Sequence, residues 1–237
     1  MSSATLPPIV LAFSAADPTG GAGVQADLLT LASMGCHALS VITAITVQDT
    51  AGVENLQAID PEWVVDQARL VLEDMPVLAT EDMISAMCEL LLPQTTILTP
   101  NSREARRLVQ GDGEDDDELA LPGAAEKLLG LGCEYVLITG THENTPQVVN
   151  TLYGPEGVVR SDSWERLPGS YHGSGCTLAA AIAATLANGL ELPEAVREAQ
   201  EYTWQTLNAG FRPGMGQYIP DRFFWAREMD EPGTGKA

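Results

Sequence analysis

The chain has 237 residues, of which 45% are hydrophobic, and its 33 acidic and 12 basic residues give a formal net charge of −21. A surface this acidic repels nucleic acids and anionic membranes, which excludes both as expected partners. The apolar runs are too short to span a bilayer, and residues 1–10 lack the pattern of a signal peptide. We therefore expect a single cytoplasmic domain covering residues 1–237.

The acidic residues are spread along the chain, with one dense run at residues 112–118. They indicate either an acidic interaction module or a solvated acidic coat like that of proteins from salty cytoplasms. Because the acidic residues are spread along the chain, the sequence favours the solvated acidic coat. The cysteines have no paired spacing, which argues against a disulfide framework or a zinc cluster and fits a reducing compartment. They are Cys36, Cys88, Cys133 and Cys176.

In chain order, the pattern first predicts a buried strand at 8–13, a helix at 25–34, a buried strand at 38–47 and a helix at 61–74. The alternation continues with helices at 81–91, 101–108, 124–131, from 177, and at 193–208, and with strands at 96–99, 135–138 and 148–153. The strands are apolar without period-two alternation. This predicts an α/β fold with a mostly parallel central sheet and helices on both faces.

Polar or glycine-rich motifs follow the carboxyl ends of the expected strands. They are Asp17–Gly23, Gln48–Asp49, Thr99–Asn101, Thr139–His142 and Gly173–Cys176. In open parallel sheets, ligands bind beyond these strand ends, so we expect the motifs on one rim. The sequence therefore predicts an enzyme with a phosphate-handling site.

The most informative motif is the turn Gly173–Thr177, which leads into an apolar helix. Such a turn aims several backbone N–H groups and the positive end of the helix dipole at one point, as in anion sites. Cys176 stands where a nucleophile, a base or an anion-hole donor would stand, and a helix N-terminus favours its thiolate. The alternative is a plain glycine turn before a buried helix.

Several motifs also occur in the order of a known family. These are Asp17–Asp27, Thr43–Thr50, Thr99–Asn101 with Glu104, and His172–Thr177. In these motifs the chain resembles the hydroxymethylpyrimidine/phosphomethylpyrimidine kinases of thiamine biosynthesis, which belong to the ribokinase-like superfamily. Segments 166–172 and 214–220 further resemble a bacterial subgroup of that family.

The resemblance implies that Mg-ATP phosphorylates 4-amino-5-hydroxymethyl-2-methylpyrimidine, first on the hydroxymethyl group and then on the resulting phosphate. By position, Gln48 would hydrogen-bond the aminopyrimidine, and Asp27 would lie near that pocket. Ala15 and Asp17 match further positions of the substrate pocket. A bidentate amide such as Gln48 suits a neutral pyrimidine, although it could also simply cap the end of a strand.

The resemblance also implies residues for ATP and for the transfer. Asn101 and Glu104 would organise Mg²⁺ and the phosphates, with Glu104 as the metal ligand. The other nucleotide-binding positions are Thr139, Gly140 and His142. The catalytic positions, whose amides would form the anion hole, are Gly173, Ser174, Gly175 and Cys176. Cys176 takes the place of an aspartate base found in most relatives.

Simpler structural roles exist for three of the polar residues near these loops. Glu104 could be an ordinary first-turn helix residue that complements the dipole. His142 and His172 could be polar loop residues without a ligand. Cys36, Cys88 and Cys133 carry no motif and are expected to be structural.

The chain departs from the family pattern at three places. Ala15 replaces a usual glycine, and Thr139 replaces a frequent lysine. Near residues 79–80, the family's central strand–helix–strand segment is absent. The printed sequence could omit residues of the molecule, the protein could be a shortened homologue, or a partner could cover the gap.

Two rival functions follow from these observations. A pyridoxal kinase shares this fold and can share the Gly-x-Gly-Cys loop. A non-catalytic pyrimidine-binding homologue would fit the departures. Sheet surface uncovered by the missing segment would favour a homodimer.

Overall fold

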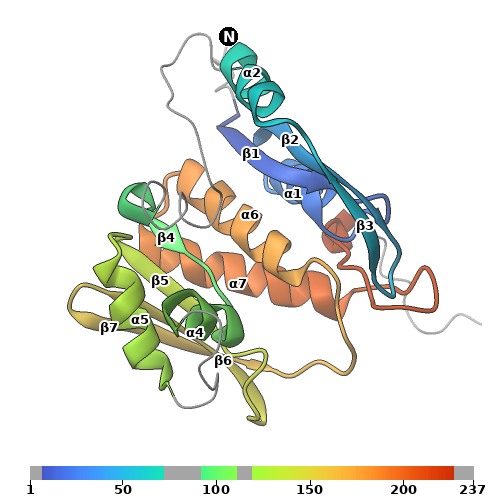
Figure 1. The fold of residues 1–237 in the computed structure, drawn as a ribbon. Coiled ribbons are helices and arrows are strands. Elements are labelled where there is room, and N and C mark those ends of the chain that lie inside the picture. The colour runs from blue at the N-terminus through green and yellow to red at the C-terminus, as the bar shows by residue number, and fades with distance from the viewer. Residues whose placement is uncertain (1–6, 72–91, 111–118, 227–237) are drawn as a thin grey trace, which may run out of the picture. The chain divides into compact units, whose positions relative to one another are not determined.

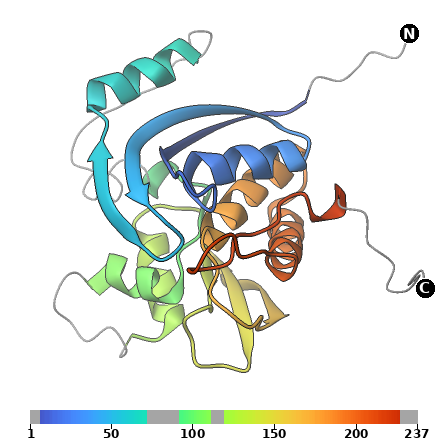
Figure 2. The same ribbon diagram turned by 90° about the vertical axis from the view of Figure 1, so that its right-hand side faces the viewer.

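The computed structural model describes residues 7–71, 92–110 and 119–226 (Figures 1 and 2). They fall into two compact units. The first comprises residues up to 60, residues 169–190 and residues from 198 onward, and the second comprises 61–168 and 191–197. The helix expected at 81–91, the gap near 79–80, Cys88 and the acidic run at 112–118 lie outside the described residues.

The first unit contains a three-stranded sheet in the order β1–β2–β3. Strands β1 (Ile9–Ala16) and β2 (His37–Gln48) are parallel, and β3 (Val53–Ala58) returns antiparallel to β2. Helix α1 (Gly23–Ser33) joins the parallel pair, as a parallel connection requires. The apolar and β-branched residues of β1 and β2 explain why these segments form strands.

Helix α6 (Ser174–Ala187) packs against α1 and β1 within the first unit (Figure 1). Their contact is filled by small and apolar side chains. The buried members of this cluster are Leu31, Cys36, Ala180 and Ala184. Alanines allow the two helices to approach closely, which brings the start of α6 to the loop that follows β1.

The second unit contains a four-stranded sheet in the order β4–β5–β6–β7. Its strands are β4 (Ile97–Leu98), β5 (Tyr135–Thr139), β6 (Gln147–Gly154) and β7 (Gly157–Glu165). Strands β4 and β5 are parallel, whereas β5–β6 and β6–β7 are antiparallel pairs. Helices α4 (Ser102–Gln110) and α5 (Leu121–Gly130) pack on β5 around a core that includes Leu128 and Val136.

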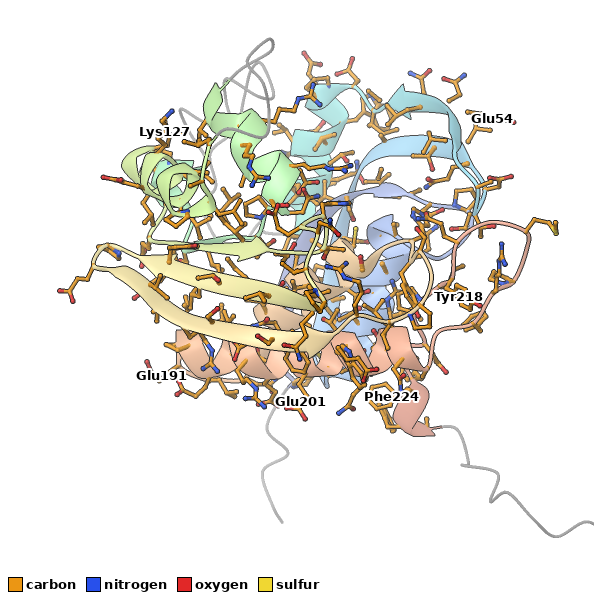
Figure 3. The ribbon with its side chains drawn as sticks, turned by 90° about the horizontal axis from the view of Figure 1, so that it is seen from below. Glu54, Lys127, Glu191, Glu201, Tyr218 and Phe224 are labelled. Carbon is orange, nitrogen blue, oxygen red and sulfur yellow. The ribbon has the colours of Figure 1, made fainter. Side chains whose placement is uncertain are left out.

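The remaining described elements are α2 (Pro61–Val71), the 3₁₀ turns η2 (Leu92–Gln94) and η3 (Phe224–Ala226), and α7 (Leu192–Asn208). Among the described residues, no helix is both long and apolar enough to cross a membrane. Among the described cysteines, Cys36, Cys133 and Cys176 are free thiols. Exposed acidic side chains such as Glu54, Glu191 and Glu201 point outward from their elements (Figure 3).

The α/β class is confirmed, but the prediction of a mostly parallel sheet is wrong for the described residues. They form two mixed sheets, in which antiparallel pairs outnumber parallel ones. The sequence missed β3 and β7, which are largely exposed and follow their partner strands after tight turns. Their polar residues gave no buried-strand signal, although half-buried residues alternate with exposed ones along β7.

Candidate functional site

The glycine-rich loop after β1 is organised by the carboxylate of Asp17, whose side chain is 1% exposed. Its Oδ1 accepts the N–H of Thr19 at 2.8 Å, and its Oδ2 accepts the N–H of Ala22 at 2.7 Å. Burial alone would raise the pKa of Asp17, but these hydrogen bonds and the Thr19 hydroxyl outweigh it and lower the pKa. Nε2 of His172 lies 3.0 Å from the same Oδ2. The loop is thereby tied to the segment that precedes α6.

Gly173 brings this segment into direct contact with the glycine-rich loop. Its φ of +78° is left-handed, and a Cβ built on it would overlap the carbonyl oxygen of Gly21. Only glycine fits this position. The Gly173 carbonyl accepts both the N–H and the hydroxyl of Thr177, at 3.0 and 2.9 Å. Helix α6 therefore begins with the N–H groups of residues 174–176 free of intrahelical acceptors, in the arrangement that binds anions.

Cys176 lies in this first turn, half-buried beside α1. Burial raises the pKa of its thiol, the N–H of Gly23 and the charge of Arg222 lower it, and the charge of Asp27 raises it further. The net shift is upward. Desolvation and the charge of Asp27 thus oppose the thiolate that the helix N-terminus was expected to favour.

Asp27 and Ser14 lie on the two elements that flank the loop. The Ser14 hydroxyl donates to Oδ2 of Asp27 at 2.7 Å. Burial raises the pKa of Asp27, although Ser14 and Arg222 lower it. The backbone of Ala15 is in close contact with Gly23, since a Cβ on Gly23 would overlap the Ala15 carbonyl oxygen.

Gln48 is the last residue of β2 and is half-buried at a register shift opposite Val53. The next residue, Asp49, accepts the N–H groups of Ala51 and Gly52 at 2.7 and 3.0 Å and so closes the turn to β3. These hydrogen bonds lower the pKa of Asp49. Gln48 thus stands at the carboxyl end of its strand, as expected.

A hollow of about 290 Å³ lies beyond this turn. Its lining residues are Thr50, Ala51, Gly169, Ser170, Arg212, Met215, Gly216, Gln217 and Tyr218. Tyr218, labelled in Figure 3, pairs with Tyr171 in a parallel bridge. The two segments that resemble a bacterial subgroup therefore lie side by side. The hollow contains none of the predicted site residues.

In the second unit, Asn101 and Glu104 form a reciprocal cap at the start of α4. Oδ1 of Asn101 accepts the N–H of Glu104 at 2.9 Å, and Oε2 of Glu104 accepts the N–H of Asn101 at 2.9 Å. This is the capping box that the spacing of three residues allows. The structural role considered for Glu104 is thus observed, and its exposed carboxylate remains an oxygen donor of the kind that Mg²⁺ prefers.

Thr139 and Gly140 end β5 beside this cap. Thr139 forms a parallel bridge with Asn101, and its N–H donates to the Pro100 carbonyl at 3.0 Å. The N–H of Gly140 donates to Oδ1 of Asn150 at 3.1 Å. The ends of β4 and β5 therefore lie side by side, as the sequence predicted. His142 follows in the same loop and is exposed.

Two arginines that contact the loops of the predicted site residues were not identified from the sequence. Arg166 binds the loop that contains His142 through the carbonyl oxygens of Thr141 and Glu143, at 2.8 and 3.0 Å. Arg222 is 2% exposed and contacts both loops of the first unit. Arg166 begins the segment 166–172, for which the sequence indicated only the resemblance to a bacterial subgroup and no role of this side chain. Arg222 belongs to no motif, and its burial depends on contacts between distant segments.

Each unit thus gathers its own set of predicted residues. In the first unit, the Asp17 loop contacts the segment at Gly173, and Ala15 contacts Gly23 of that loop. Asp27 bonds Ser14, and its charge acts on Cys176. Gln48 stands at a neighbouring strand end. In the second unit, Asn101, Glu104, Thr139 and Gly140 adjoin one another. Among the described residues, no group of three or more His, Cys, Asp or Glu side chains could hold a metal ion.

Comparison with known proteins identifies the family of this chain. A family model described as phosphomethylpyrimidine kinase matches residues 17–80 and 77–221. The hydroxymethylpyrimidine/phosphomethylpyrimidine kinase of Streptomyces coelicolor is 33% identical over 255 residues, which cover 89% of this chain and 92% of the relative. The Escherichia coli enzyme of the same name is 30% identical and covers 83% of this chain and 90% of the relative.

Solved structures of such kinases share the α/β fold, which is ribokinase-like. A pyridoxal kinase from Staphylococcus aureus in complex with AMP-PCP and pyridoxal matches with a TM-score of 0.82 and 25% identity, covering 94% of this chain and 96% of that one. A phosphomethylpyrimidine kinase from Clostridium difficile matches with a TM-score of 0.65 and 26% identity, covering 82% and 97%. The chain belongs to the phosphomethylpyrimidine kinase family.

Proposed function

We propose that the protein phosphorylates 4-amino-5-hydroxymethyl-2-methylpyrimidine and then its monophosphate with Mg-ATP, in thiamine biosynthesis. The observation that carries this proposal is the 33% identity, over 89% of the chain, to a kinase named for these two substrates. The contact between the Asp17 loop and the start of α6 supports it, because this contact fixes an anion-binding helix terminus.

Phosphoryl transfer needs little covalent assistance from a protein. Its transition state spreads negative charge over the phosphoryl oxygens, so alignment and charge neutralisation dominate catalysis. We assign the neutralising role to the N–H groups of Ser174, Gly175 and Cys176 in the first turn of α6. Their fixed orientation, set by Gly173, requires no rearrangement during the reaction.

Mg²⁺, when bound, supplies further neutralisation of the phosphate oxygens. The exposed carboxylate of Glu104 fits this ion, because Mg²⁺ takes one or two carboxylates and keeps much of its water. We assign Glu104 to the ion and Asn101 to the orientation of Glu104, through the hydrogen bond between them. Thr139, Gly140 and His142 are assigned to the nucleotide.

In the first unit, Gln48 is assigned to the aminopyrimidine, with Asp27, Ala15 and Asp17 around it. An amide offers a donor and an acceptor to a ring that carries both. The raised pKa of Asp27, which burial causes, keeps a proton available there at higher pH than an ordinary carboxyl would. Asp17 acts on the loop rather than on the ring, through its hydrogen bonds to Thr19 and Ala22.

We also propose that the family's central segment is absent from this chain. The two matched pieces of the family model meet at residues 77–80, which supports a break at that position. The alignment of 255 residues to the Streptomyces coelicolor relative exceeds the 237 residues of this chain, so that relative has residues without a counterpart here.

Pyridoxal kinase is the second candidate function. The TM-score of 0.82 to a pyridoxal kinase, against 0.65 to a phosphomethylpyrimidine kinase, favours it. Both substrates present a hydroxymethyl group on a nitrogen-containing ring, so the same transfer site could serve either.

Turnover with each substrate tests the proposed function. We expect the purified chain to convert Mg-ATP to ADP with a kcat/KM for the hydroxymethylpyrimidine at least about tenfold above that for pyridoxal. Coupled measurement of ADP release, with phosphorylated products identified by mass spectrometry, gives both values. A preference for pyridoxal would support the second candidate, and pyrimidine binding without ADP release would indicate a non-catalytic homologue.

Gln48→Ala should raise the KM for the pyrimidine about tenfold and leave kcat within about threefold, because it removes hydrogen bonds made equally before and during transfer. Steady-state kinetics measure the effect. Gln57→Ala is the control, since Gln57 is exposed on β3 and its side chain bonds the adjacent Ala58 carbonyl. Equal effects of the two variants would remove Gln48 from the pocket.

Cys176→Ser should lower kcat about 100-fold with little change in KM, if the thiolate of Cys176 accepts the proton of the substrate hydroxyl. The thiol must lose its own proton to act. Because burial raises its pKa, the wild-type rate should keep rising with pH through the range where an ordinary thiol has already ionised. The pH dependence of kcat for both proteins measures this. A serine variant that reacts at the wild-type rate would refute the base role and leave the anion site intact.

A further inference from the structure

Arg222 is a buried cation that the sequence did not single out. Its side chain donates to the carbonyl oxygens of Gly20 and Gly21, at 3.3 and 2.6 Å. It also donates to the hydroxyl of Thr177, from Nε at 3.1 Å and from Nη2 at 2.9 Å. One guanidinium group thus binds both the glycine-rich loop after β1 and the first turn of α6.

The backbone of Arg222 is held in place from two other elements. Its carbonyl oxygen accepts the hydroxyl of Ser33, on α1, at 2.6 Å and that of Tyr202, on α7, at 2.9 Å. The preceding residue, Asp221, donates its N–H to the Thr206 carbonyl at 2.9 Å. The guanidinium therefore projects from a fixed point, so its hydrogen bonds can fix the loops relative to the helices.

Burying a charge is costly, and a buried ionic group is often replaced by apolar residues without loss of stability. The free energy of unfolding therefore gives no clear reason for an arginine at this position, whereas the geometry of its hydrogen bonds does. The planar fork of arginine reaches acceptors on two loops at once, which the single ammonium of lysine does not. Its positive charge also faces the ionisable groups of Asp17, Asp27, Cys176 and Tyr202.

We infer that Arg222 is a positioning residue, which holds the Asp17–Gly23 loop and the first turn of α6 in the mutual arrangement that phosphoryl transfer requires. This inference rests on the proposed function for its kinetic consequence, but its structural consequence can be measured without any substrate. Arg222 contacts neither reactant in this account and acts through Gly20, Gly21 and Thr177.

Arg222→Lys tests the inference, because it keeps the charge and removes the fork. We expect kcat to fall about 100-fold while both KM values stay within about threefold, since small misplacements of catalytic groups cost rates of this size. The matched control is Arg160→Lys. Arg160 is a half-buried arginine of β7 that bonds Asp162 and the Pro193 carbonyl and has no assigned role in the site.

Amide hydrogen exchange provides the readout that does not depend on activity. In Arg222→Lys, exchange should become about tenfold faster for the hydrogen-bonded amides of Asp17, residues 19–22 and Thr177, and stay unchanged in the core of the second unit. A merely stabilising role would instead speed exchange throughout the cooperative structure. Thr177→Val removes one acceptor of Arg222 and leaves the arginine in place, so we expect the same local increase in exchange. This variant provides the test if Arg222→Lys does not fold.

The outcomes separate the two proposals. If wild-type protein phosphorylates neither pyrimidine nor pyridoxal, the proposed function fails, and hydrogen exchange alone decides the role of Arg222. If Arg222→Lys reacts within about twofold of wild type and exchanges like Arg160→Lys, the positioning role is overturned.

Discussion

The contact between Gly173 and the carbonyl oxygen of Gly21 is the constraint on which the first unit's site depends. A side chain at residue 173 would occupy the position of that oxygen, so the two loops can meet only through glycine. The hydrogen bond between Asp17 and His172 supports this contact, and Arg222 donates to the same Gly21 carbonyl oxygen. The start of α6, and with it the direction of its free N–H groups, follows from this arrangement.

This arrangement also resolves an apparent conflict in the chain's electrostatics. A protein with a net charge of −21 repels ATP and phosphorylated substrates at long range. A helix terminus and a buried guanidinium provide local positive potential where the loops meet, and burial makes it less sensitive to screening by salt. Burial raises the pKa of the Cys176 thiol, whereas the charge of Arg222 lowers it.

The sequence predicted most elements of the fold because their apolar runs and helical periodicity are local signals. It also located the loops at the ends of β1, β4 and β5, since glycine and polar residues mark strand ends. It missed the exposed strands β3 and β7, whose pairing depends on their partners. The sequence did not indicate a role for Arg222 for the same reason, because its acceptors lie in distant segments, 201 and 202 residues away at Gly21 and Gly20 and 45 residues away at Thr177.

The most direct test of the central constraint compares alanine at two left-handed glycines. Gly173→Ala should lower turnover with Mg-ATP at least about 100-fold, because its Cβ would displace the Gly21 loop. Gly189 has a similar φ of +89° but faces open space, so Gly189→Ala carries the backbone strain of about 1 kcal/mol without a clash. We predict near wild-type turnover for Gly189→Ala and loss of turnover in folded Gly173→Ala. Equal activity of the two variants would contradict the account.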